Sequence, residues 1–201
     1  MHPNKVFAWE DRGAVLRFVA DRAFAHVFTA SEGGLFVVHV PVLVTERGRI
    51  QFHVSRRNRI ADQLPGRVLI SISGREAYQS ANWYVSDNQV PTWHYEVVEI
   101  EGAARMLASE ELVEHLDGLS DRFESQYQPE KPWMRGKMTS GKFEAMTCGI
   151  VGFEVDLLEV RAMRKFNQHK STEDIAATTA GQAGAGRRDI VEAIGEVTKS
   201  G

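Results

Sequence analysis

Residues 49–55, Arg-Ile-Gln-Phe-His-Val-Ser, alternate strictly between apolar and polar side chains after the first arginine, and no other segment restricts the fold as much. One face of this segment carries Ile50, Phe52 and Val54, and the opposite face carries Gln51, His53 and Ser55. A repeat of two residues is the repeat of a β-strand with one buried and one polar face. Such half-buried strands are typical of antiparallel sheets.

Five further segments have strand character, at residues 24–30, 35–44, 67–73, 92–108 and 150–163. Helices are expected over residues 9–23, 109–126, 140–147 and 187–197, with Ser109 as the N-cap of the second one. Residues 77–91 are expected to be irregular, and residues 183–186 to form a flexible link. Short strands joined by glycine-bearing turns favour an antiparallel sheet or barrel with helices at both ends over a βαβ fold.

Composition excludes several classes of protein. The net charge of −3 and the pI near 6.2 argue against a generally basic surface that coats nucleic acid. A single cysteine, Cys148, rules out an internal disulfide, and we expect it to pack as a small apolar residue. No spacing of histidines and acids matches a zinc signature, and no P-loop, G-x-S-x-G or G-x-G-x-x-G motif occurs. The absence of an apolar leader or a long apolar run leads us to expect a soluble, cytoplasmic protein with no membrane contact.

Two groups of residues are candidates for ligand binding. Three arginines stand in the run Ser55-Arg56-Arg57-Asn58-Arg59, which is either an anion site at a strand end or a solvated charged turn. Five large aromatic side chains follow within eighteen positions, at Tyr78, Trp83, Tyr84, Trp93 and Tyr95. They would suit a planar ring ligand, but they could equally anchor a loop to the core.

Several segments together resemble the PaiB family, which is described as FMN-binding negative transcriptional regulators. Residues 38–41 and 53–58 are similar to its T-H-x-P and G-H-(V/L)-A-R-A-N segments. Residues 79–84 and 90–95 are similar to I-S-P-S-W-Y and V-P-T-W-N-Y, and residues 164–170 to K-L-S-Q-N-R. The chain departs from these patterns at several positions, among them Val38, Ser55, Arg57 and His94.

The resemblance implies a mainly β fold with flanking helices, the antiparallel six-stranded split β-barrel of pyridoxine-phosphate-oxidase-like proteins. It also implies a homodimer with FMN at the subunit interface. The expected contacts to the flavin phosphate are Ser55, Arg56, Arg57 and Asn58. Beside the flavin would lie His39, Val40 and His53, and the pocket would be closed by Trp83, Tyr84, Thr92 and Trp93. The last strand would add Lys165 and Gln168.

The expected division of the chain is a split-barrel domain at 1–170 and a C-terminal helical extension at 171–201. A flavin supplies hydride chemistry, so an FMN-dependent oxidoreductase is one expectation, with His94 and Tyr95 as the nearest acid or base candidates. A regulator acting through DNA or a protein partner is a second, although no helix-turn-helix or basic helix is visible. Haem binding or degradation is a third, with His39, His94 or His169 as the axial ligand.

Overall fold

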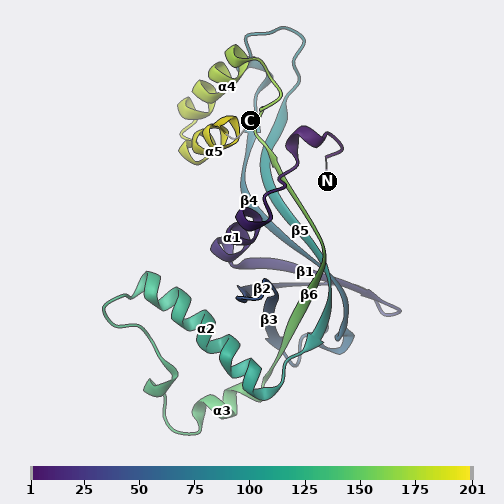
Figure 1. Cartoon of the computed structure of the whole chain (residues 1–201), viewed down its shortest axis with the longest axis vertical. Coiled ribbons are helices and arrows are strands. Elements are labelled where there is room, and N and C mark those ends of the chain that lie inside the picture. The colour runs from purple at the N-terminus through teal and green to yellow at the C-terminus, as the bar shows by residue number, and fades with distance from the viewer. Residues whose placement is uncertain (1, 200–201) are drawn as a thin grey trace. The chain divides into compact units, whose positions relative to one another are not determined.

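The computed structural model describes residues 2–199 of the chain (Figure 1). The chain divides into two compact units. Unit 1 consists of Met1–Val15, Ser73–Val98 and Arg161–Gly201, and unit 2 consists of Leu16–Ile72 and Glu99–Val160. Each unit is described by itself below.

Six strands form a closed barrel in the order β1-β2-β3-β6-β5-β4, and the registers of β1 with β2 and β4, and of β3 with β2 and β6, are antiparallel. The strands are β1 (Phe24–Ser31), β2 (Gly34–Val44), β3 (Ile50–Ser55), β4 (Gly66–Gln79), β5 (Thr92–Met106) and β6 (Ile150–Lys165). The helices are α1 (Arg12–Arg22), α2 (Ser109–Tyr127), α3 (Lys142–Thr147), α4 (Thr172–Gly184) and α5 (Arg188–Lys199). Four short 3-10 turns are η1 (Lys5–Phe7), η2 (Ala61–Gln63), η3 (Ala81–Trp83) and η4 (Arg135–Lys137). The predicted six-stranded antiparallel barrel with flanking helices is confirmed.

The core of unit 2 lies under β3. Its alternating residues pair with β6, Phe52 opposite Phe153 and His53 opposite Gly152, and the two phenylalanine rings lie 5.5 Å apart. The apolar side chains of β3 are buried and its polar side chains are not, as the alternation predicts. Burying one face of each strand supplies the main driving force for closing the sheet.

Helix α2 covers part of β2 and β3. The prediction of Ser109 as its N-cap is wrong, because the capping position is Ala108. The Glu111 carboxylate accepts a hydrogen bond from the Ala108 backbone N–H at 2.8 Å, and Arg105 holds that carboxylate at 2.7 Å. A carboxylate in the first turn of a helix satisfies a free N–H and matches the helix dipole, so α2 can begin without a side-chain cap.

The core of unit 1 is built by Ala77 from β4, Phe166 after β6, and Ile190, Ala193 and Ile194 from α5. Figure 1 shows α4 and α5 side by side in this unit. Four charged side chains form a cluster next to this core. Arg75 binds Glu96 at 2.9 Å and Glu196 at 2.8 Å, and Arg164 lies 3.3 Å from Glu96.

Three local predictions are wrong. Strand β4 continues to Gln79 through a segment expected to be partly irregular, because Arg75 finds carboxylate partners far along the chain. The supposed flexible link at 183–186 includes the last turn of α4, and only its end turns, with φ of +76° at Gly186. Cys148 is exposed rather than packed as an apolar residue.

Helices α4 and α5 occupy residues 172–199 of the expected extension, whose last two residues lie outside the described part. The boundary at residue 170 stays a prediction. Within residues 2–199, no helix is both long enough and apolar enough to cross a membrane.

Candidate functional site

The thirteen predicted ligand-binding residues fall into two groups, one in each unit. Unit 2 holds His39, Val40, His53, Ser55, Arg56, Arg57 and Asn58, and unit 1 holds Trp83, Tyr84, Thr92, Trp93, Lys165 and Gln168. Within these groups, Lys165 contacts Thr92, and Ser55, Arg57 and Asn58 share the hydrogen bonds of one turn.

The arginine turn, residues 55–59, leaves the end of β3 and runs towards η2. The Arg57 N–H donates to Ser55 Oγ at 3.2 Å, and the Asn58 N–H donates to Ser55 O at 2.9 Å. Asn58 Oδ1 accepts from the Ile60 N–H at 3.1 Å. These local bonds fix the backbone of the turn, as serine and asparagine side chains commonly do.

The arginines of this turn are not equivalent. Arg56 Nε donates to the Cys148 carbonyl at 3.0 Å, so this side chain partly ties the turn to the segment before β6. The Arg59 guanidinium lies 5.1 Å above the Phe36 ring. The Arg57 side chain is exposed and makes no hydrogen bond, ion pair or ring contact with any residue of the range 2–199. Arg57 is therefore the cation most available to an incoming anion.

His53 forms a pair with a residue that the sequence did not single out. Its Nδ1 lies 3.0 Å from Nε2 of His115 on α2, and the two rings meet edge to face at 5.2 Å. Burial lowers the pKa of His115 to about 4, with a further lowering from the charge on His53. Burial also lowers the pKa of His53. His115 stands three positions after Leu112 and four before Leu119, on the apolar face of α2, and this spacing was the available signal.

The remaining two predicted residues of unit 2 lie on β2. Val40 faces the core, and its side chain is 4% exposed. His39 points to the opposite, exposed side, where it meets His26 of β1 edge to face at 4.6 Å. Any contact of Val40 with a ligand would therefore be through its backbone, whereas His39 offers its ring.

In unit 1 the aromatic segment is anchored to α4. Trp83 packs so closely on Gly181 that a methyl group there would lie 2.4 Å from the indole. The Tyr84 hydroxyl donates to Asn167 Oδ1 at 3.1 Å, and Lys170 lies 5.4 Å from the centre of its ring. These contacts match the alternative stated from the sequence, that Trp83 and Tyr84 anchor the segment to its own unit.

The other members of this group differ in how free their side chains are. Lys165 Nζ donates to Thr92 Oγ1 at 2.8 Å. The Gln168 amide accepts from the Phe166 N–H at 2.8 Å and donates to Arg164 O at 2.6 Å, so it has a structural role. Trp93 is 55% exposed, and the Tyr78 ring is the one aromatic ring of residues 2–199 that it meets, edge to face at 6.2 Å. Trp93 is thus the member of this group with the most ring surface available for stacking.

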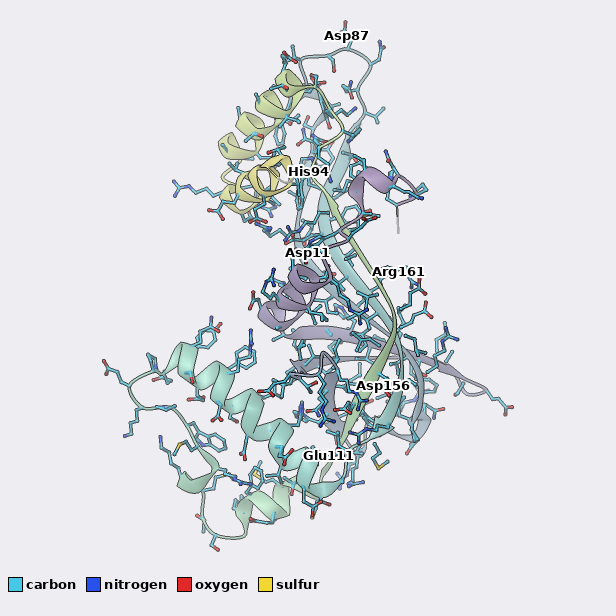
Figure 2. The ribbon with its side chains drawn as sticks, in the orientation of Figure 1. Asp11, Asp87, His94, Glu111, Asp156 and Arg161 are labelled. Atoms are coloured by element: carbon cyan, nitrogen blue, oxygen red, sulfur yellow. The ribbon has the colours of Figure 1, made fainter. Side chains whose placement is uncertain are left out.

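The three histidines proposed as haem ligands differ in access. His94, labelled on β5 in Figure 2, has no exposed surface, and no residue in the range 2–199 makes a well-aligned hydrogen bond to either ring nitrogen, although Asn167 lies near enough to raise its pKa in part. Its ring packs against Phe166 at 5.7 Å, and burial lowers its pKa to about 4. His169 lies edge to face with Phe7 at 5.0 Å on the surface, and His39 is exposed as described above. Among the residues that the structure describes, no three His, Cys, Asp or Glu side chains converge as a metal site.

Comparison with known proteins shows the family and the fold of the chain. A family model described as "Putative FMN-binding domain" matches residues 1–159. The protease synthase and sporulation protein PAI 2 of Bacillus subtilis (strain 168) is 28% identical over 180 residues, which cover 87% of this chain and 85% of that protein.

Solved structures share the fold at low sequence identity. The FAD and haem binding protein from Mycobacterium smegmatis aligns with a TM-score of 0.59 at 15% identity, over 85% of this chain and 79% of that one. The conserved hypothetical protein Rv2991 from Mycobacterium tuberculosis aligns with a TM-score of 0.59 at 14% identity, over 82% and 90% of the two chains. These similarities confirm the split barrel.

Proposed function

The chain belongs to the family of FMN-binding domains that includes PaiB-type proteins, and on this premise we propose that it anchors the FMN phosphate at the arginine turn and uses the flavin for redox chemistry. The observation that carries the proposal is the exposed Arg57 guanidinium, which has no partner within residues 2–199 and stands beside Arg56 and Ser55. A guanidinium fork matches the geometry of a phosphate group and binds it through charge-assisted hydrogen bonds.

The donors of the arginine turn fit a phosphate, and the flavin would supply hydride transfer when bound. The chain's own part is to hold and orient that group. Exposed His39 adds a ring surface in unit 2, as the family resemblance suggests for a flavin contact.

The test is an FMN titration of Arg57→Ala, followed by quenching of flavin fluorescence. Loss of a charge-assisted hydrogen bond of about 1.5–3 kcal/mol should weaken FMN binding by roughly ten- to a hundredfold. Arg47→Ala is the matched control, because Arg47 is also an exposed arginine on a turn of unit 2 but lies outside the proposed site. Equal affinity of the wild type and Arg57→Ala for FMN would remove Arg57 from the site.

A homodimer is part of the same proposal. The outward face of the β1–β2 hairpin carries Phe28, Leu35 and Val37, which are 39%, 89% and 48% exposed. His39 continues the same face of β2, two positions after Val37. An exposed apolar stripe beside a proposed flavin contact suits a second copy of this chain, because such a surface is costly to leave in water.

We expect Val37→Glu to shift the mass measured by light scattering from dimer to monomer, because it would bury a charge in that interface. Glu32→Gln, in the hairpin turn, should leave the mass unchanged. A wild-type chain that is monomeric at micromolar concentration would contradict the proposal.

Haem is the second candidate ligand, since the Mycobacterium smegmatis protein with the same fold is described as binding FAD and haem. The absorption spectrum of the freshly purified protein distinguishes the two. Flavin bands support the first proposal, and a Soret band supports haem. A regulatory role through DNA would require specific retention of one DNA sequence in a gel shift, and equal retention of unrelated DNA would contradict it.

A further inference from the structure

Unit 2 contains a cavity of about 420 Å³. Of the thirteen residues predicted to bind a ligand, His53 alone lines this cavity. The cavity lies against β3, α2 and α3 and the loop between the two helices, which Figure 1 shows as a long connection. Most of its lining is apolar, including Leu116, Trp133, Met138, Phe143 and Met146. Cavities of this size with aromatic and apolar walls are typical of small-molecule sites.

The wall formed by the α2–α3 loop is held by polar contacts. The Trp133 N–H donates to Glu124 Oε2 at 2.8 Å, and Arg135 forms an ion pair with Asp117 at 3.4 Å. The Arg135 guanidinium also lies 5.5 Å from the centre of the Phe143 ring. These contacts keep the loop on unit 2, and Arg135 neutralises the one carboxylate that borders the cavity.

His53 contributes the polar group of this cavity, and His115 determines which form of the ring it presents. His115 Nδ1 is buried and has no hydrogen-bond partner. A buried N–H without a partner is more costly than an unprotonated nitrogen there, so the proton of His115 belongs on Nε2. The Nε2–H then donates to His53 Nδ1, and the neutral His53 ring must carry its own proton on Nε2.

His53 Nε2 makes no hydrogen bond with any residue in the range 2–199. The lowered pKa values of both histidines keep the pair neutral at pH 7. The Ser120 and Thr147 hydroxyls that also line the cavity donate to Leu116 O and Glu144 O, so His53 Nε2–H and the Trp133 indole N–H are the lining groups that can donate to a ligand. The lining residues of the cavity include no lysine or arginine.

We propose that this cavity binds a planar, uncharged ring compound with a carbonyl oxygen, which accepts a hydrogen bond from His53 Nε2–H, and that His115 is the positioning residue that fixes this tautomer. Aromatic walls suit a flat ring, and the thioethers of Met138 and Met146 pack well against its edges. This site is for a second small molecule and does not depend on FMN binding.

The tautomer is tested first, on the wild-type chain labelled with ¹⁵N-histidine. Long-range ¹H–¹⁵N correlation should show His53 protonated on Nε2 and bare on Nδ1 at pH 7. The same pattern is expected in His115→Gln, whose amide can still donate to His53 Nδ1. Protonation of His53 on Nδ1 in the wild type would overturn the proposal, and this measurement needs no variant to fold.

Binding is tested with two matched probes, 2-acetylnaphthalene and 2-ethylnaphthalene, which differ in the carbonyl oxygen. In a chain labelled with ¹³C-methyl methionine, both probes should shift Met138 and Met146 and leave Met106, which does not line the cavity, in place. The ketone should bind roughly three- to tenfold more tightly in the wild type and in His115→Gln, and this preference should vanish in His53→Leu, which lacks the donor. Equal binding of the two probes in the wild type, or unmoved Met138 and Met146 signals, would refute the site.

A final titration repeats the ketone experiment with FMN at saturation. Continued shifts of Met138 and Met146 would support a second ligand beside the flavin. Competitive loss of the ketone would show that the cavity belongs to the flavin itself and would overturn the proposal.

Discussion

Acid should destabilise unit 1 in large part through His94, and replacing this residue by leucine should remove that part of the effect. Within residues 2–199 neither ring nitrogen of His94 has a well-aligned hydrogen bond, and its side chain has no exposed surface. Burial is the largest cause of its lowered pKa, which falls from 6.5 to about 4 in the folded chain. The unfolded chain therefore binds a proton on this residue at a pH where the folded chain does not.

The direction of the pH dependence follows from this difference. Since the folded pKa lies below the unfolded one, stability falls as the pH decreases below 6.5 and levels off below about 4. The full difference corresponds to about 3 kcal/mol, of which about 2.5 kcal/mol is lost at pH 4.5. The free energy of unfolding of His94→Leu should thus decrease less than that of the wild type, by about 2 to 3 kcal/mol, between pH 7.5 and pH 4.5.

The assay is urea unfolding at both pH values, followed by tryptophan fluorescence. Three of the four tryptophans, Trp9, Trp83 and Trp93, belong to unit 1 and report on its unfolding. His39→Gln, at an exposed position of unit 2, is the control and should behave as the wild type. An equal loss of stability in wild type and His94→Leu would refute the claim that His94 is buried and uncharged.

Two further predictions concern the packing of α4. Gly181→Ala should destabilise the chain by about 1–3 kcal/mol in urea unfolding, because its methyl group would overlap the Trp83 ring. Gly184→Ala on the same helix has no atom within 4 Å of the added methyl and should be neutral or stabilise by up to about 1 kcal/mol; equal losses for both variants would contradict the packing argument. Asp174→Asn should speed proteolysis near Ser86, because the Asp174 carboxylate accepts from the Ser86 N–H at 3.0 Å and the Ser86 hydroxyl at 2.6 Å. An unchanged digestion rate, measured by mass spectrometry, would show that these bonds do not hold the loop.

The barrel was the most predictable part of the molecule, because its signal is local. Strand β3 alternates within its own sequence, and Ile50, Phe52 and Val54 needed no distant partner to be recognised as a buried face. The end of β4 was less predictable. In the sequence, the charged Arg75 indicates the end of a strand. In the fold it binds Glu96 and Glu196, which lie 21 and 121 positions later, and β4 continues past it.

Helix α4 was not predicted as a separate element, although a helical extension was expected from residue 171. Its last two residues belong to the segment 183–186, whose alanines and glycines indicate a flexible link when read alone. The structure starts the helix at a cap, in which the Asp174 N–H donates to Ser171 Oγ at 3.1 Å, and Asp174 then binds the loop at Ser86. The cap was visible in the sequence, but the contact with Ser86 was not.

The sequence indicated which residue types make up the candidate site. It did not indicate which of their side chains lack a hydrogen-bond partner in the fold. Three neighbouring arginines looked equivalent in sequence, and only the structure separates Arg56, bound to the Cys148 carbonyl, from Arg57. Gln168 likewise appeared to be a ligand contact, although its amide bonds to backbone groups nearby. Sequence motifs report which side chains are present, whereas hydrogen-bond partners depend on segments that meet only in the fold.

The two units are completed at different times during synthesis. Every segment of unit 2 has been made once residue 160 is joined to the chain, whereas unit 1 still lacks the segment that begins at Arg161. That segment supplies Phe166, Ile190 and Ile194 to its core, and Glu196 to Arg75. On a ribosome, Ala77 would therefore wait without its core partners and Arg75 without Glu196, while every segment of unit 2 is already present. Unit 1 is the part of the nascent chain that a chaperone would have most reason to hold.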